Sequence, residues 1–181
     1  MTHSKKIVVP NDFSIKPLIL LKKILENNPE QNFDIMLLHG IYPPDCISDL
    51  LFYSKIRVIK EMENEEFVRA CNLFKNSFRS RITAMYADVI TSVRKDALDA
   101  FLEVNEIEEI YLPEGLEFTF RNNQSFNLIP LLEKAAIPVK IVAFESVPQV
   151  ATSTPGELSG LFINELTKTL IKPYQSSAAL S

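Results

Sequence analysis

Short apolar runs alternate with stretches of helical periodicity along the first 145 residues. An apolar run of five to nine residues bounded by turn residues is typical of a buried strand, and apolar side chains three and four positions apart indicate a helix. Five runs predict strands: Lys6–Pro10, Phe33–Ile41, Ile82–Ile90, Ile107–Leu112 and Pro138–Phe144. Four stretches predict helices between them: from Ser14 as N-cap to Asn27, Lys60–Arg81, Val93–Val104 and Leu128–Ala136. Strands that alternate with helices predict a parallel sheet covered by helices on both faces.

Two parts of the chain depart from this alternation. Residues Asp45–Ile59 fit either a short helix or a lid-like excursion. Beyond the last strand, Glu145–Ser153 resembles a linker, and Thr154 with Pro155 then begins an amphipathic helix to Lys172. We therefore predict an α/β domain over residues 1–146, followed by a linker and C-terminal helix over 147–181.

Composition narrows the possible functions. Hydrophobic residues make up 46% and charged residues 23% of the 181 residues, which is ordinary for a globular protein. The chain has only four glycines, and they form neither GxGxxG nor GxxxxGK[ST]. Phosphate loops need glycines because the backbone must approach the anion closely. A Walker-type nucleotidase and a standard dinucleotide-binding enzyme are therefore not expected.

Charge, hydrophobic run length and cysteine content argue against further classes of protein. The net charge is −4 and the 19 basic residues are scattered, so we expect no nucleic-acid binding. The apolar runs are far shorter than the roughly 20 residues that cross a bilayer, so we expect no membrane insertion. The polar N-terminus does not resemble a signal peptide. Cys46 and Cys71 form no metal-ligand spacing with His3 and His39, so we predict no metal and a reducing, cytoplasmic location.

The order of the predicted strands and their sequence motifs resemble those of the universal stress protein family. Residues 7–14 read IVVPNDFS, similar to the family's ILVPxDxS, and residues 37–40 read LLHG, similar to its LLHV. Residues 108–113, EEIYLP, stand where the family has an acidic residue before its fourth strand. Residues 137–142, IPVKIV, look like its CPVLVV. The resemblance covers residues 5–144 and implies a doubly wound, three-layer, five-stranded sheet in the order 3-2-1-4-5.

The chain departs from this family at the loop that follows the fourth strand. ATP-binding members hold the triphosphate on a segment resembling GxxGx9GS. Residues 113–125, PEGLEFTFRNNQS, keep only Gly115 and Ser125 of that pattern, and Gln124 stands where the last glycine belongs. Glu114 and Glu117 add negative charge where phosphates would lie. We therefore expect no cofactor, with weak ATP or AMP binding as the alternative.

Candidate binding residues gather at the carboxyl ends of the strands, where ligands bind in open α/β sheets. These residues are Pro10, Asp12, Ser14, His39, Ile41, Pro113, Gly115 and Ser125. Asp12 fits either a ligand contact or an Asx turn, and His39 either a ligand contact or a hydrogen-bonded core residue. Ser125, with Asn127, fits either an anion site or a helix cap.

The resemblance implies a regulatory or interaction protein rather than an enzyme. An adenylating enzyme needs glycines after the first strand, and residues 10–14 contain none. The alternative is a sensor that retains a small-molecule or adenine-nucleotide pocket beside Asp12. We expect a homodimer through residues 138–144 and the helix of residues 155–172, which either crosses to the partner or covers its own sheet edge, and in addition an unknown protein partner.

Overall fold

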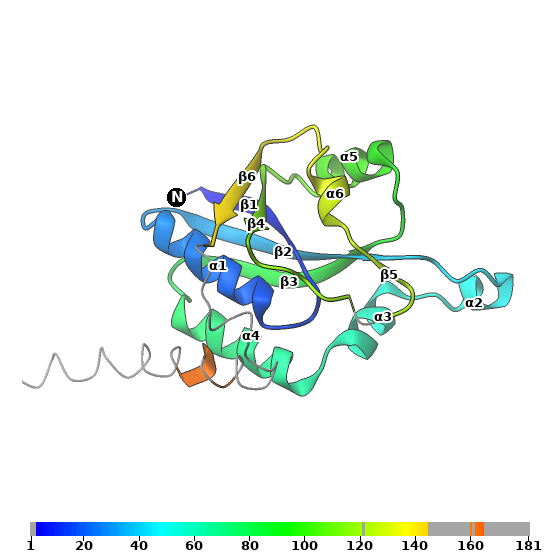
Figure 1. Cartoon of the computed structure of the whole chain (residues 1–181), viewed down its shortest axis with the longest axis horizontal. Helices are drawn as coiled ribbons and strands as arrows, with labels where there is room; N and C mark the ends of the chain where they lie inside the picture. The colour runs from blue at the N-terminus through cyan, green and yellow to red at the C-terminus, as the bar shows by residue number, and fades with distance from the viewer. Residues whose placement is uncertain (1–2, 121, 145–159, 161, 165–181) are drawn as a thin grey trace, which may run out of the picture.

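The computed structural model describes residues 3–120, 122–144, 160 and 162–164, and Figure 1 shows their arrangement. The strands are β1 (Ser4–Pro10), β2 (Asn32–Ile41), β3 (Ile82–Ile90), β4 (Glu109–Glu114), β5 (Ser125–Phe126) and β6 (Val139–Ala143). The helices are α1 (Lys16–Asn27), α2 (Ile47–Leu51), α3 (Lys55–Met62), α4 (Glu65–Ser77), α5 (Lys95–Val104) and α6 (Ile129–Leu132). Most of the predicted helix of residues 155–172 lies outside the described residues.

The sheet confirms the predicted strand order. Its order is β3-β2-β1-β4-β6, with every one of these neighbours parallel, so β6 takes the place of the predicted fifth strand. The sheet also contains a strand that was not predicted, β5, which pairs antiparallel with the end of β2 through Gly40 and Ile41. Gly40 is needed there because a Cβ would lie 2.5 Å from the Phe126 ring.

Two apolar layers hold the helices against opposite faces of the sheet. On one face, Ile7 and Val9 of β1 belong to a buried cluster with α1 and α4, which supply Leu21 and Phe74. On the other face, Val8 joins a second cluster. The second cluster takes Leu98 and Leu102 from α5 and Leu132 from α6. The period-two alternation of side chains in a strand explains why neighbouring β1 residues face opposite layers.

The region before β3 corrects the predicted helix over Lys60–Arg81. The chain forms two helices, α3 and α4, because Asn64 interrupts the turn and caps α4, accepting a 2.8 Å hydrogen bond from the backbone N–H of Phe67. Asn64 is therefore an N-cap residue rather than a helix-interior residue. The uncertain stretch before it contains the short helix α2, which projects away from the sheet (Figure 1).

Several helices and strands begin or end at residues other than those predicted. Ile15, not Ser14, is the N-cap of α1, although Ser14 Oγ accepts a hydrogen bond from the N–H of Lys16. The α5 helix begins at Lys95, and β4 runs two residues later than predicted. The helix predicted over Leu128–Ala136 ends at Leu132 because tighter turns follow, and Asp99 of α5 accepts a hydrogen bond from the N–H of Ala136. In the described part of the chain, no helix is long and apolar enough to cross a bilayer.

Candidate functional site

The carboxyl end of β1 carries a tight loop built on side-chain hydrogen bonds. Pro10 ends β1 beside Leu38, and Asn11 Oδ1 accepts the N–H of Phe13 at 2.9 Å. Phe13 has a φ of 56°, a left-handed conformation that is uncommon for a residue with a Cβ. The buried ring of Phe13 packs in the core, which holds this conformation. The loop therefore presents Asp12 at the end of the sheet in a fixed position.

Asp12 is buried, and both of its carboxylate oxygens are engaged. Oδ1 accepts hydrogen bonds from Ser14 Oγ at 2.6 Å and from the Ser14 N–H at 3.1 Å. Oδ2 accepts the N–H of Thr119 at 2.9 Å. The first two bonds make the Asx turn that the sequence allowed. The third ties the loop after β4 to the end of β1.

The loop after β4 reaches across to the carboxyl ends of β1 and β2. Besides the Thr119 bond to Asp12, the ring of Phe120 lies 5.7 Å from the His39 ring, centroid to centroid. Phe118 packs against the same core cluster as α1. The Lys16 side chain also bonds to the carbonyl of Glu117. The loop thus covers the place where a ligand of an open α/β sheet would enter.

His39 lies at the end of β2 and links Ser125 to the loop after β1. Its side chain is buried, with Nδ1 2.7 Å from the carbonyl oxygen of Asn11 and Nε2 2.8 Å from Ser125 Oγ. Burial lowers the pKa of His39, while the Asn11 carbonyl and the Asp12 carboxylate act in the opposite direction. The ring is therefore neutral near pH 7. Ile41, also buried, pairs with Ser125 across β2 and β5.

The structure separates the predicted residues into two groups. Asp12, Ser14, His39, Ile41 and Ser125 lie around the ends of β1 and β2. Pro113 belongs to β4 and pairs with Val142 of β6. Gly115 has a φ of 81°, and a Cβ there would lie 2.7 Å from the Phe144 carbonyl oxygen. Gly115 therefore serves the close approach of β4 and β6.

Asn11 is a site residue that sequence reasoning missed. It is fully buried, and its Oδ1 orientation is set by the Phe13 N–H. Its Nδ2 finds no hydrogen-bond partner among the described residues. A buried, unpaired donor is costly, so it calls for a water or ligand acceptor. The signal in the sequence was its place beside Asp12 at a strand end.

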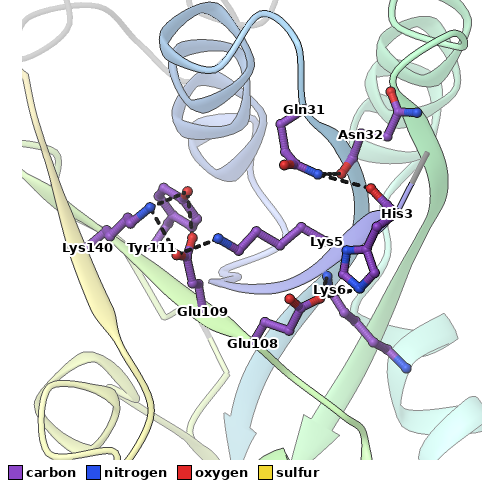
Figure 2. Close-up of polar contacts among 9 residues, drawn as sticks. All are labelled: His3, Lys5, Lys6, Gln31, Asn32, Glu108, Glu109, Tyr111 and Lys140. Atoms are coloured by element: carbon purple, nitrogen blue, oxygen red, sulfur yellow. Dashed lines mark hydrogen bonds and ion pairs between the residues drawn. The ribbon is translucent and has the colours of Figure 1, made fainter.

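A second polar cluster lies at the opposite, amino-terminal end of the strands (Figure 2). The buried Glu109 carboxylate bonds to Lys5 at 2.6 Å, Lys140 at 3.0 Å and the Tyr111 hydroxyl at 2.9 Å. Although burial acts to raise it, the pKa of Glu109 is lowered because these three partners stabilise the carboxylate. This cluster joins β1, β4 and β6, and it gives the acidic residue at the start of β4 a structural role.

A hollow of about 440 Å³ lies at the same end of the sheet. Acidic and basic side chains line it together, among them Lys6, Asp34 and Glu108.

Within the described ranges, no three His, Cys, Asp or Glu side chains are placed to hold a metal ion. Burial raises the pKa of the Cys71 thiol to about 12, so this thiol is unreactive near neutral pH.

No family model matches this sequence, and no curated protein matches it. Solved structures do match. They include universal stress protein UspA from Lactobacillus plantarum, with 10% identity and a TM-score of 0.49 over 78% of this chain and 99% of that one. Another is a universal stress protein family member from Burkholderia pseudomallei, with 14% identity and a TM-score of 0.45 over 76% and 95%.

A third similar structure is a universal stress protein in complex with cAMP, with 15% identity and a TM-score of 0.46 over 76% of this chain and 96% of that one. Likeness at this level concerns the path of the chain alone. It says nothing of a ligand for this protein.

Proposed function

We propose that this chain is a cytoplasmic regulatory or interaction protein of the universal-stress-protein type, which acts through contacts with other chains rather than through turnover and does not bind ATP in the usual way. One observation carries the proposal. The loop that would hold phosphates is bonded to Asp12 through Thr119, so both oxygens of this carboxylate are already engaged within the chain. Phosphates would also meet the exposed acids Glu114 and Glu117.

An exposed apolar excursion supports the interaction role. Five large side chains from the end of β2 to the first turn of α3 are exposed, at 77% for Ile47, 46% for Leu50, 78% for Leu51, 77% for Phe52 and 68% for Ile56. Clustered exposed apolar side chains mark interaction sites in soluble proteins. We call residues 47–56 the apolar arm. We propose that the arm contacts the unknown protein partner.

The sheet edge supports self-association. The edge strand β6 has Ile141 exposed at 55%, and an uncovered apolar edge invites pairing. We propose a homodimer that pairs β6, with a contribution from residues 155–172.

Calorimetry with Mg-ATP tests the proposal. We expect a dissociation constant no lower than the high micromolar range, because each lost phosphate contact removes on the order of 1 kcal/mol. Sub-micromolar binding would contradict it. ADP and inorganic triphosphate serve as controls that separate base contacts from phosphate contacts.

The unpaired Nδ2 of Asn11 favours a second candidate, a small-molecule sensor with its pocket beside Asp12. Such a molecule would bring an acceptor atom to this donor. AMP and other adenine compounds would then raise the melting temperature of the native chain but not that of the Asn11→Leu variant. Equal shifts, or none, for the two proteins would exclude this candidate.

A further inference from the structure

His39 connects two residues into one chain of hydrogen bonds. Nδ1 of His39 lies 2.7 Å from the Asn11 carbonyl oxygen, and Nε2 lies 2.8 Å from Ser125 Oγ. The three groups come from three places in the sequence: the loop after β1, the end of β2 and β5. A nucleophile, a base within hydrogen-bond reach and a third group that orients the base are the parts needed to activate a serine.

The Asn11 carbonyl determines the direction of both hydrogen bonds of His39. A carbonyl oxygen only accepts, so Nδ1 of a neutral His39 carries the ring proton and donates it. Nε2 then holds a lone pair, and the hydrogen bond to Ser125 is donated by the serine hydroxyl. Ser125 Oγ is left with its own lone pairs for another atom. This is the tautomer that a general base requires.

The surroundings suit proton transfer to His39. Desolvation keeps the ring neutral near pH 7 and lowers its pKa. The Asn11 carbonyl and the charge of Asp12 favour the protonated ring. Both would therefore stabilise the imidazolium that forms when the serine loses its proton. Among the residues that the structure describes, Asp12 is the charged group whose field acts on His39.

We propose that Ser125 is a nucleophilic serine that accepts an acyl group from a neutral, activated carboxylic ester, with His39 as its base. In this step the Ser125 oxygen forms a bond to the acyl carbon, and the bond from that carbon to the leaving oxygen breaks. The hydroxyl proton passes to His39 and then to the leaving group. No oxidant or reductant takes part.

Charge and shape favour a neutral donor with a small apolar acyl group. Asp12 carries a negative charge beside His39, so an anionic donor would be repelled. The rings of Phe13 and Phe120 lie 5.2 and 5.7 Å from the imidazole and form apolar walls around it. A short acyl chain fits such surroundings better than a phosphoryl group.

The local backbone favours a lasting acyl-serine over repeated turnover. The N–H of Ser125 bonds to the Asn122 carbonyl, and the N–H of Gln124 bonds to the Asn122 side chain. Both donors are engaged, so neither stabilises an oxyanion at Ser125. An activated ester with a good leaving group still reacts, whereas hydrolysis of the resulting alkyl ester is slow. Ser125 is thus a modification site, in keeping with a protein that does not turn over a substrate.

The test uses p-nitrophenyl acetate with the full-length chain, followed by peptide mapping of acetylated residues. Ser92 is the control within the same molecule, because it is also half-buried and its Oγ only accepts a backbone N–H. We expect Ser125 to be acetylated about 10²-fold faster than Ser92, the gain typical of a positioned base. Equal rates at the two serines, or no acetyl-Ser125, would overturn the proposal.

Two further readouts separate a base from a structural histidine. In His39→Gln, acetylation of Ser125 should fall about 10²-fold while Ser92 is unchanged. In the native chain the rate should be level from pH 7 to 8 and fall only as the pH drops through the lowered pKa of His39, since His39 is already neutral at pH 7. An unassisted hydroxyl would instead react about tenfold faster per pH unit, and that result would contradict the role of His39. Mapping both serines in one native protein keeps the test valid if the variant does not fold.

Discussion

The backbone N–H of Thr119 donates a 2.9 Å hydrogen bond to Oδ2 of Asp12, and the two residues are 107 positions apart in the chain. This bond joins the loop after β4 to the loop after β1. It lies at the carboxyl ends of β1 and β4, the point at which the strand order reverses. Ligands of open α/β sheets usually bind at this point. The same carboxylate that would bind a ligand thus holds the covering loop in place.

Replacing Asp12 should therefore destabilise the fold. Asp12→Ala removes the acceptor of three hydrogen bonds and leaves the Ser14 and Thr119 donors unpaired. We expect the free energy of unfolding to fall by about 2–4 kcal/mol in urea denaturation. The exposed Asp45 provides the control, and Asp45→Ala should change stability by less than about 0.5 kcal/mol. Equal effects of the two variants would mean that the Asp12 bonds contribute little.

His39 should make stability depend on pH in mildly acidic solution. Burial lowers its pKa below 6.5 in the folded chain, so between the two pKa values the unfolded chain binds more protons. Stability should be full above pH 6.5 and decline as the pH falls toward the folded pKa. The His39→Gln variant should lack this decline between pH 7 and pH 5. Identical slopes for both proteins would place the transition on another group.

The apolar arm should contribute little to the stability of a single chain. Leu51 and Phe52 are exposed at 78% and 77%, so Leu51→Ser with Phe52→Ser should lower the free energy of unfolding by less than about 1 kcal/mol. The same change should reduce binding of an apolar dye to the native protein. Phe74→Ala, at a fully buried position, should cost about 3–5 kcal/mol in the same denaturation experiment. A large loss from the arm variant would show that these side chains are buried in solution.

A charge at the sheet edge should prevent dimerisation through β6. Ile141→Lys places an ammonium group on the exposed face of β6, and light scattering should then report a monomer. Val104→Lys is the matched control, because Val104 is exposed at 82% and lies at the end of α5, on a helix rather than on the edge strand. A dimer that survives Ile141→Lys would require a different interface.

The sheet was predictable because its strands are apolar runs with clear boundaries. Ile7, Val8 and Val9 are all fully buried, as a central strand covered on both faces must be. The break between α3 and α4 was not found because apolar spacing continues across it. The signal was Asn64 followed by two acids, an N-cap with a negative first turn.

The contacts of the site were less predictable than its location. The sequence placed Asp12 and His39 at strand ends and Ser125 before a helix. Their partners depend on a loop that crosses the sheet and on β5, which has two residues and no periodicity of its own. The bond between His39 and Ser125 spans 86 positions, and no local pattern specifies it.

A native mass spectrum of the full-length chain purified from cells tests the central claim most directly, because it reports subunit number and bound nucleotide together. We predict the mass of two chains without a nucleotide. A single chain carrying ATP would contradict both the proposed dimer and the proposal that the engaged Asp12 carboxylate leaves no usual ATP site.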